Sequence, residues 1–151
     1  MPGALSFDAA DGGDAVAPEL AADIVWFDAL MANVDRTPRN PNLLLWHGRL
    51  WLIDHGAAVY HQHAAGDLAA QARASFPAIG EHVLLPHAGP ILEADGRLAP
   101  RLPAETLEAL AALIPQEWQE HPSEAYATWL RRRLAEPHAF AQEAEDARAG
   151  Q

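Results

Sequence analysis

Two short apolar runs joined by a Gly-containing turn constrain the fold of this chain more than any other feature. The first run is Leu43-Leu44-Leu45 and the second is Leu50-Trp51-Leu52-Ile53, with His47-Gly48 between them. Apolar runs of this length on either side of a short turn favour antiparallel pairing. The sequence therefore predicts a β-hairpin within residues 43–53.

Polar side chains flank both runs at the end of the hairpin away from its turn. Asp35, Asn40 and Asn42 precede the first run, and Asp54 follows the second. Because the two strands of a hairpin begin and end at the same place, we expect these side chains to converge there. Their oxygens suit Mg²⁺, which proteins usually hold with one or two carboxylates and substrate phosphates. Each residue alone is an ordinary turn former, so the prediction depends on their joint order and spacing.

The order of these residues resembles the catalytic and metal-binding loops of the protein-kinase-like superfamily. Asp-Arg-Thr-Pro-Arg-Asn-Pro-Asn-Leu-Leu at residues 35–44, followed by Asp-His-Gly at 54–56, is most similar to the HipA-like kinases. The resemblance is specific over about residues 26–56. It implies the C-terminal lobe of a protein-kinase-like fold, mainly α-helical with a small β-hairpin. It also implies transfer of the ATP γ-phosphate to an unidentified hydroxyl acceptor, with Mg²⁺ as cofactor.

The resemblance assigns a role to each polar residue. Asp35 would accept or orient the proton of the acceptor hydroxyl, and Asp54 with an Asn would hold the Mg²⁺ that bridges the ATP phosphates. A spacing of five residues after Asp35 selects Asn40, whereas direct continuation into the apolar strand selects Asn42. Both therefore stay candidates for binding the metal and the nucleotide. Arg36 is expected to pair with a nearby carboxylate or phosphate.

The part of a kinase that binds the ATP phosphates is not evident in this sequence. Kinases hold the ATP phosphates with a Lys beneath a Gly-rich loop of the N-terminal lobe. All ten basic residues here are Arg, and 34 residues before Asp35 are too few for that lobe. We therefore expect a flexible lead-in at residues 1–17 and a kinase-like C-terminal lobe at 18–151. The N-terminal lobe is expected on a missing segment or a partner chain, and the chain alone is expected to be inactive.

Charge and composition argue against several classes of function. The net charge of −11 disfavours direct binding of nucleic acid, which requires clustered Lys and Arg. The one basic cluster, Arg131-Arg132-Arg133, is expected to be a solvated helix surface. No run approaches the roughly 18–20 apolar residues of a membrane span, and the N-terminus has no secretory signal pattern. The absence of Cys fits a cytoplasmic location.

Helical spacing of apolar residues predicts most of the remaining structure. Residues 18–32 are predicted as a helix that leads to the catalytic loop, with Asp28 expected to be solvated rather than to brace that loop. A short helix at 68–76 is predicted after a cap at Asp67, and Ser123 is predicted to cap a later helix that Pro137 interrupts. The apolar stripes expected in the core are Leu20, Ile24, Phe27 and Met31, then Leu107, Leu110, Ala111, Ile114 and Trp118, and finally Tyr126, Trp129, Leu130 and Leu134.

Two other functions fit the same residues. The first is a non-catalytic binding or regulatory lobe that docks on a separate N-terminal lobe, with an exposed apolar patch as its sign. The second is a metal-dependent phosphohydrolase, or an unrelated helical protein, that uses Asp35 and Asp54 in a different geometry. His61 and His63 form a His-x-His pair with no obvious third ligand, so an ordinary loop is the better interpretation. His55 is expected to pack locally.

Overall fold

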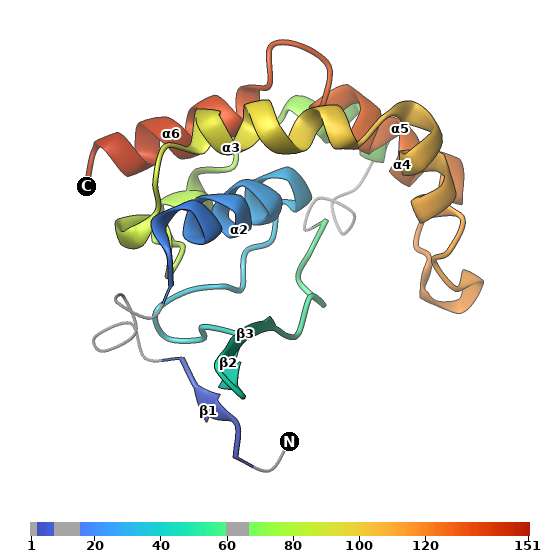
Figure 1. The fold of residues 1–151 in the computed structure, drawn as a ribbon. Helices are drawn as coiled ribbons and strands as arrows, with labels where there is room; N and C mark the ends of the chain where they lie inside the picture. The colour runs from blue at the N-terminus through green and yellow to red at the C-terminus, as the bar shows by residue number, and fades with distance from the viewer. Residues whose placement is uncertain (1–2, 8–15, 60–66) are drawn as a thin grey trace.

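The structure is a computed structural model that describes residues 3–7, 16–59 and 67–151. It is mainly helical with one small three-stranded antiparallel sheet, as the sequence predicts at this level (Figure 1). In the described part of the chain, no helix combines the length and apolar character needed to cross a membrane. The strands are β1 (Leu5–Ser6), β2 (Leu43–Trp46) and β3 (Arg49–Leu52), and the α-helices are α2 (Pro18–Met31), α3 (Ile91–Leu98), α4 (Ala104–Ala111), α5 (Ser123–Arg133) and α6 (Ala139–Ala149). Short 3₁₀ turns connect them: η3 (Leu68–Arg73), η4 (Pro77–Glu81), η5 (Leu85–His87), η6 (Ala99–Arg101) and η7 (Gln116–Trp118).

The predicted hairpin is confirmed by the pairing of β2 with β3. Leu43 lies opposite Leu52, and Trp46 lies opposite Arg49. The two turn residues, His47 and Gly48, both have positive φ, 51° and 69°. This is the backbone geometry that matches the twist of paired strands and that Gly adopts without strain.

A third strand, β1, comes from the segment predicted as a flexible lead-in. Leu5 pairs with Leu45 in an antiparallel register, and the backbone N–H of Phe7 donates to the Leu43 carbonyl over 3.0 Å. Phe7 and Val16 are both buried. The lead-in prediction is therefore wrong for these residues, because their apolar side chains complete the core against the hairpin.

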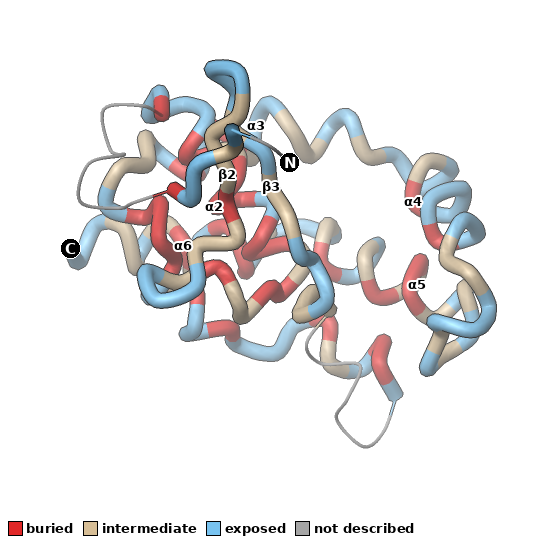
Figure 2. The backbone as a smooth tube through the Cα atoms, turned by 90° about the horizontal axis from the view of Figure 1, so that it is seen from below, coloured by how far each residue is buried: buried red, intermediate tan, exposed pale blue. Residues whose placement is uncertain are grey.

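Helix α2 is the central element of the molecule. It lies between the sheet with its loops on one side and α3 and α6 on the other (Figure 1). Most of its residues are buried, as the burial colouring of the backbone shows (Figure 2). The helix is predicted correctly, and its expected apolar stripe is partly confirmed: Ile24 is buried, whereas Leu20 and Phe27 are 45% and 39% exposed. Because the helix is covered on two sides, Val25, Trp26 and Leu30 are buried as well.

The C-terminal helices pack as two groups. α4 packs on α5, which also contacts η3, and α6 packs against α2 and α3. The break at Pro137 and the cap at Asp67 are confirmed, although the capped element is a 3₁₀ helix that ends at Arg73. Ser123 does not cap α5; its hydroxyl accepts a hydrogen bond from the Gln119 side chain over 3.1 Å.

The predicted apolar stripes of this region are partly buried and partly exposed. Tyr126 and Trp129 are buried, as predicted. Leu110 is instead 49% exposed, because α4 turns its opposite face, with Leu107, toward the core. Trp118 lies beyond α4 in η7 and is 75% exposed.

Candidate active site

The loop that carries the predicted site leaves α2 through a tight helix end. Helix α2 stops at Met31, and Ala32 adopts a left-handed backbone conformation with φ of 48°. The Asn33 backbone N–H and its side-chain amide donate to the Asp28 carbonyl and carboxylate, each over 2.9 Å. The Asn33 side-chain oxygen accepts from the Asp35 N–H over 3.3 Å. Asn33 therefore fixes the direction in which the chain runs toward Asp35.

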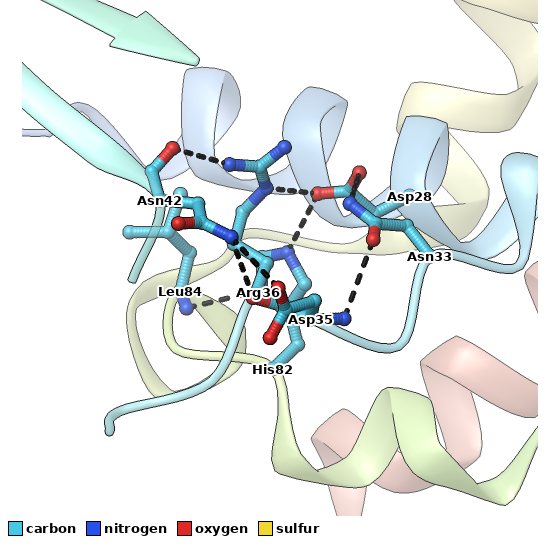
Figure 3. A network of polar contacts seen from close by, with 7 residues as sticks. All are labelled: Asp28, Asn33, Asp35, Arg36, Asn42, His82 and Leu84. Atoms are coloured by element: carbon cyan, nitrogen blue, oxygen red, sulfur yellow. Dashed lines mark hydrogen bonds and ion pairs between the residues drawn. The ribbon is translucent and has the colours of Figure 1, made fainter. Parts of the chain in front are cut away.

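A buried carboxylate on α2, Asp28, holds the loop from the helix side (Figure 3). Arg36 Nε donates to Asp28 Oδ2 over 2.5 Å, His82 Nε2 lies 3.0 Å from the same oxygen, and all three residues are buried. Burial would raise the pKa of Asp28, but hydrogen bonds from His82 and Arg36, with the charge of Arg36, outweigh it and hold this pKa below its usual value. The expectation that Asp28 is solvated is therefore wrong, and the alternative that it braces the loop is confirmed.

His82 brings a distant segment of the chain to the same carboxylate. The Leu84 N–H donates to His82 Nδ1 over 3.1 Å, so Nδ1 carries no proton and Nε2 carries one. His82 Nε2 then donates to Asp28, so His82 and Arg36 together stabilise the Asp28 carboxylate. The Val83 N–H also donates to the Arg36 carbonyl over 3.0 Å. The sequence does not predict this role; its one signal is that His82 directly precedes three apolar residues.

Arg36 joins the start of the loop to its end. Its Nη1 donates to the Asn42 carbonyl over 2.6 Å, while its Nη2 has no hydrogen-bond partner among the described residues. The expected pairing of Arg36 with a carboxylate is confirmed by Asp28. Its side chain is completely buried, however, so this position does not suit the predicted direct contact with nucleotide phosphates.

Asp35, Asn40 and Asn42 come together in front of this buried network. Asn40 Nδ2 donates to Asp35 Oδ1 over 2.8 Å, and Asn42 Nδ2 donates to Asp35 Oδ2 over 3.2 Å and to its carbonyl over 3.0 Å. A pair of backbone hydrogen bonds between Thr37 and Asn40, both 3.1 Å, closes the turn between them. Both candidate amides therefore contact the same carboxylate, and their geometry does not choose between them.

Asp54 lies at the same mouth of the hairpin by its place in the strand register. The Ile53 N–H donates to the Asn42 carbonyl over 3.0 Å, which extends the β2–β3 pairing by one residue, and Asp54 follows directly. Asp54 is exposed, has a φ of 50°, and accepts at Oδ1 from the Gly56 N–H over 3.4 Å. A Cβ at Gly56 would lie 3.3 Å from this oxygen, so glycine leaves room for the carboxylate.

The donor set at this mouth is two carboxylates and two amides. No described contact joins Asp54 to Asp35, and the described residues contain no group of three or more His, Cys, Asp or Glu that could hold a metal ion. Mg²⁺ does not need such a group, because it usually keeps several waters and takes oxygen ligands from one or two carboxylates and substrate phosphates. Asp54 with an Asn side-chain oxygen therefore fits Mg²⁺ bound together with a nucleotide. His61 and His63 lie outside the described residues.

The Asp54–Gly56 turn contacts an aromatic side chain of α2, Phe27. His55 packs edge to face on Phe27, with ring centroids 6.4 Å apart and planes at 78°. This confirms the expected local packing of His55. It also brings the Asp54–Gly56 turn against α2, the helix that carries Asp28.

The end of α2 is held from the far end of the chain by Arg133. Its guanidinium is buried and donates to three carbonyls, those of Ala29 (Nη2, 2.6 Å), Leu30 (Nε, 2.7 Å) and Ala72 (Nη1, 2.9 Å). Burial lowers the pKa of Arg133 to about 10. The prediction of a solvated basic cluster is wrong for this residue, because the carbonyls at a buried helix end need donors.

Comparison of the chain with protein-family models, with curated proteins and with solved structures found no match.

Proposed function

We propose that this chain is the catalytic lobe of a HipA-like, Mg²⁺-ATP-dependent kinase that phosphorylates a hydroxyl group. One observation supports the proposal most strongly. Asp35, Asn40 and Asn42 form a hydrogen-bonded cluster at the mouth of a hairpin, and Asp54 follows the partner strand at that mouth. Phosphoryl transfer needs an Asp to orient the attacking hydroxyl, and an Asn with a second Asp to hold the metal.

The buried network explains how such a cluster could be kept in place without ligand. His82 and the Arg36 guanidinium fix Asp28, and Arg36 also fixes the Asn42 carbonyl. Catalytic groups must be held within a fraction of an ångström of their working geometry, and supporting hydrogen bonds provide this. The network thus positions Asp35, whose carboxylate receives the acceptor hydroxyl.

A hollow lies beside the loop that carries Asp35, although Asp35 itself is not one of its lining residues. This hollow has a volume of about 530 Å³ and lies between the turn that closes the Asp35–Asn40 loop and the segment that carries His82. Its lining residues are Thr37, Pro38, Arg39, Gly80, Glu81, His82, Pro86 and Gln151. Arg39 and Glu81 give it one cation and one anion, so we place a polar acceptor there.

The side chains that bind the ATP phosphates must come from outside the described site. The chain contains no Lys, and of the two Arg residues in the loop, Arg36 is buried in an ion pair and Arg39 is a single exposed side chain. We propose that a separate N-terminal lobe, on a further segment or a partner chain, supplies the phosphate contacts. The chain alone should then bind Mg²⁺-ATP weakly and transfer no phosphate.

Metal mapping tests this proposal on the chain as it is. Mn²⁺, used with ATP as a paramagnetic substitute for Mg²⁺, should broaden the amide NMR signals of Asp35, Asn40, Asn42 and Asp54 before those of other residues. Asp54→Asn should weaken the effect at least tenfold, because an amide replaces an anionic ligand, which corresponds to about 1.4 kcal/mol. Asp67→Asn, an exposed carboxylate that caps η3, is the matched control and should leave the broadening unchanged.

Four outcomes would contradict the proposal. Broadening centred elsewhere would reject the metal site, and an unchanged effect in Asp54→Asn would reject Asp54 as a ligand. Micromolar affinity for Mg²⁺-ATP by calorimetry would show that a further lobe is not needed. In a complex with the missing lobe, Asp54→Ala should end phosphotransfer, and retained activity would refute its role.

The alternative of a non-catalytic docking lobe is favoured by one observation. An apolar hollow of about 420 Å³ opens between α2, β3 and the end of α3, beside the exposed ring of Phe27. Leu20 and Trp51 are also exposed, at 45% and 40%. A lobe that only docks would use this hollow and would tolerate Asp35→Ala, whereas a catalytic lobe would dock equally well and lose phosphotransfer.

A further inference from the structure

An exposed apolar face lies at one end of the molecule, apart from the candidate active site. It is formed by Leu110, Leu113 and Trp118, at the end of α4 and in η7, and is called here the α4 face. In both views of the backbone, α4 and α5 lie at the edge of the molecule, away from β2 and β3 (Figures 1 and 2). The α4 face therefore has no part in the proposed phosphate chemistry.

The exposure of these side chains is unusually high for their size. Leu110 is 49% exposed, Leu113 is 76% exposed and Trp118 is 75% exposed. The Leu113 N–H donates to the Leu110 carbonyl over 3.1 Å, so Leu113 lies in a turn that directly follows the end of α4. Single exposed apolar residues are normal, but three within nine positions indicate an interaction surface.

The opposite face of α4 shows that these residues are not a misplaced part of the core. Leu107 and Ala111 are buried, and α4 packs through this side on α5. Trp118 follows a proline, and its N–H closes a turn on the Pro115 carbonyl over 2.9 Å. The local backbone is thus ordered by its own hydrogen bonds while the indole faces solvent.

The charge around the α4 face identifies the kind of partner. Residues 104–124 contain five Glu and neither Lys nor Arg. The five Glu are all exposed: Glu105, Glu108, Glu117, Glu120 and Glu124. Arg131 of α5 lies 3.3 Å from Glu108 in a half-exposed pair. The apolar side chains therefore lie in a strongly negative field.

We propose that the α4 face binds a basic amphipathic helix of another protein. Such a helix would place apolar side chains against Leu110, Leu113 and Trp118, and its flanking Lys and Arg against the Glu side chains. A second copy of this chain is a poor occupant, because each copy carries a net charge of −11 and would present the same Glu residues. Anionic lipid is repelled for the same reason.

A synthetic helix gives a direct test with the full chain. The probe is a fluorescein-labelled amphipathic peptide of Leu and Lys, with Leu at helical positions i, i+3, i+4 and i+7, and binding is followed by fluorescence anisotropy. A scrambled peptide of the same composition and charge is the control for attraction by charge alone. We expect the amphipathic peptide to bind at least tenfold more tightly than the scrambled one.

Two protein variants locate the binding. The double variant Leu113→Ser with Trp118→Ser should weaken peptide binding at least tenfold. Leu92→Ser removes a leucine that is 45% exposed on α3 and should leave binding unchanged. All three side chains are exposed, so both variants should keep the circular dichroism spectrum and melting temperature of the parent chain.

Several results would overturn the inference. Equal binding of the scrambled peptide, or equal affinity of the double variant, would show that the α4 face does not recognise an amphipathic helix. Concentration-dependent dimers that the double variant abolishes would identify a second copy as the occupant. Sedimentation of the chain with anionic phospholipid vesicles, lost in the double variant, would identify a membrane instead.

Discussion

Replacing Asp28 with alanine should be among the most damaging single changes in this protein. Its carboxylate is completely buried and contacts Asn33, Arg36 and His82. Asp28→Ala leaves the Arg36 guanidinium buried with no counter-charge, and Arg36 Nη2 already lacks a partner among the described residues. Breaking a buried ion pair by removing one partner costs about 3–5 kcal/mol. That is a large fraction of the roughly 5–15 kcal/mol that keeps a typical domain folded.

Urea denaturation followed by circular dichroism measures this loss. For a chain of this size, a loss of about 3–5 kcal/mol also lowers the melting temperature by roughly 6–20 °C. Asp23→Ala is the matched control, because Asp23 is also on α2 and pairs with Arg97 over 2.6 Å. That pair is partly exposed to solvent, so its loss should cost about 1 kcal/mol or less.

A double variant separates the cost of breaking the ion pair from the cost of the lost side-chain volume. Asp28→Leu with Arg36→Met removes both charges, so no unpaired charge stays in the core. We expect this variant to be more stable than the sum of the two single changes predicts, by about 0.5–3 kcal/mol. Additive single effects, or a loss below about 1 kcal/mol in Asp28→Ala, would refute the assignment of Asp28 as the brace of the loop.

Three further predictions follow from ionised side chains. The pKa of Asp28 is lowered in the folded state, so the unfolded chain binds the proton first as pH falls below 3.8, and the stability from this group is complete above that pH and lost below it. Urea midpoints between about pH 5 and pH 3 should therefore fall less steeply in Asp28→Asn than in the parent chain. Equal slopes would contradict this prediction. Arg133→Lys should lower the stability by about 1–3 kcal/mol in thermal melting, because an ammonium cannot match the planar guanidinium that reaches the Ala29, Leu30 and Ala72 carbonyls. Arg131→Lys, on the exposed side, is the control and should cost almost nothing. Glu145→Gln should cost about 0.5–2 kcal/mol, because Glu145 Oε2 accepts from the Ile91 and Leu92 N–H groups at the start of α3, and an unchanged melt would remove this capping role.

The hairpin and its polar mouth could be predicted from sequence because they depend on neighbouring residues. Strand pairing followed from two apolar runs and a turn, and the convergence of Asp35 with Asn40 and Asn42 followed from their place before the first strand of that hairpin. Both are local, and local order is what residue patterns describe. Asp54 could be placed at the mouth for the same reason, since it is separated from Asn42 only by the hairpin.

The supporting network could not be predicted because its partners are distant in sequence. Asp28 meets His82 across 54 positions, and nothing in the spacing of either residue indicates the other. A lone Asp on a helix is usually solvated, which is why its burial was not expected. The buried face of α2 was predicted only in part for a related reason: α3 and α6 cover the helix, and the helix sequence alone does not specify which residues they cover.

The exposure of apolar side chains could not be predicted from the sequence either. Periodicity assigns Leu110 and Trp118 to the core, because it reports which residues share a helix face. It does not report whether another element covers that face. In α4 only the side with Leu107 is covered, by α5.

The contacts of Arg133 have a consequence for how this protein is made. Its guanidinium reaches the Ala29 and Leu30 carbonyls from 104 and 103 positions further along the chain. During synthesis, α2 and the hairpin leave the ribosome long before residue 133 of the 151 is added. Until then, the Leu30 carbonyl lacks its Arg133 donor and must bind water, and the segment running to Asp35 is anchored only at its nearer contacts. Nascent chains halted before residue 133 should therefore leave this region open to protease, and the finished protein should protect it.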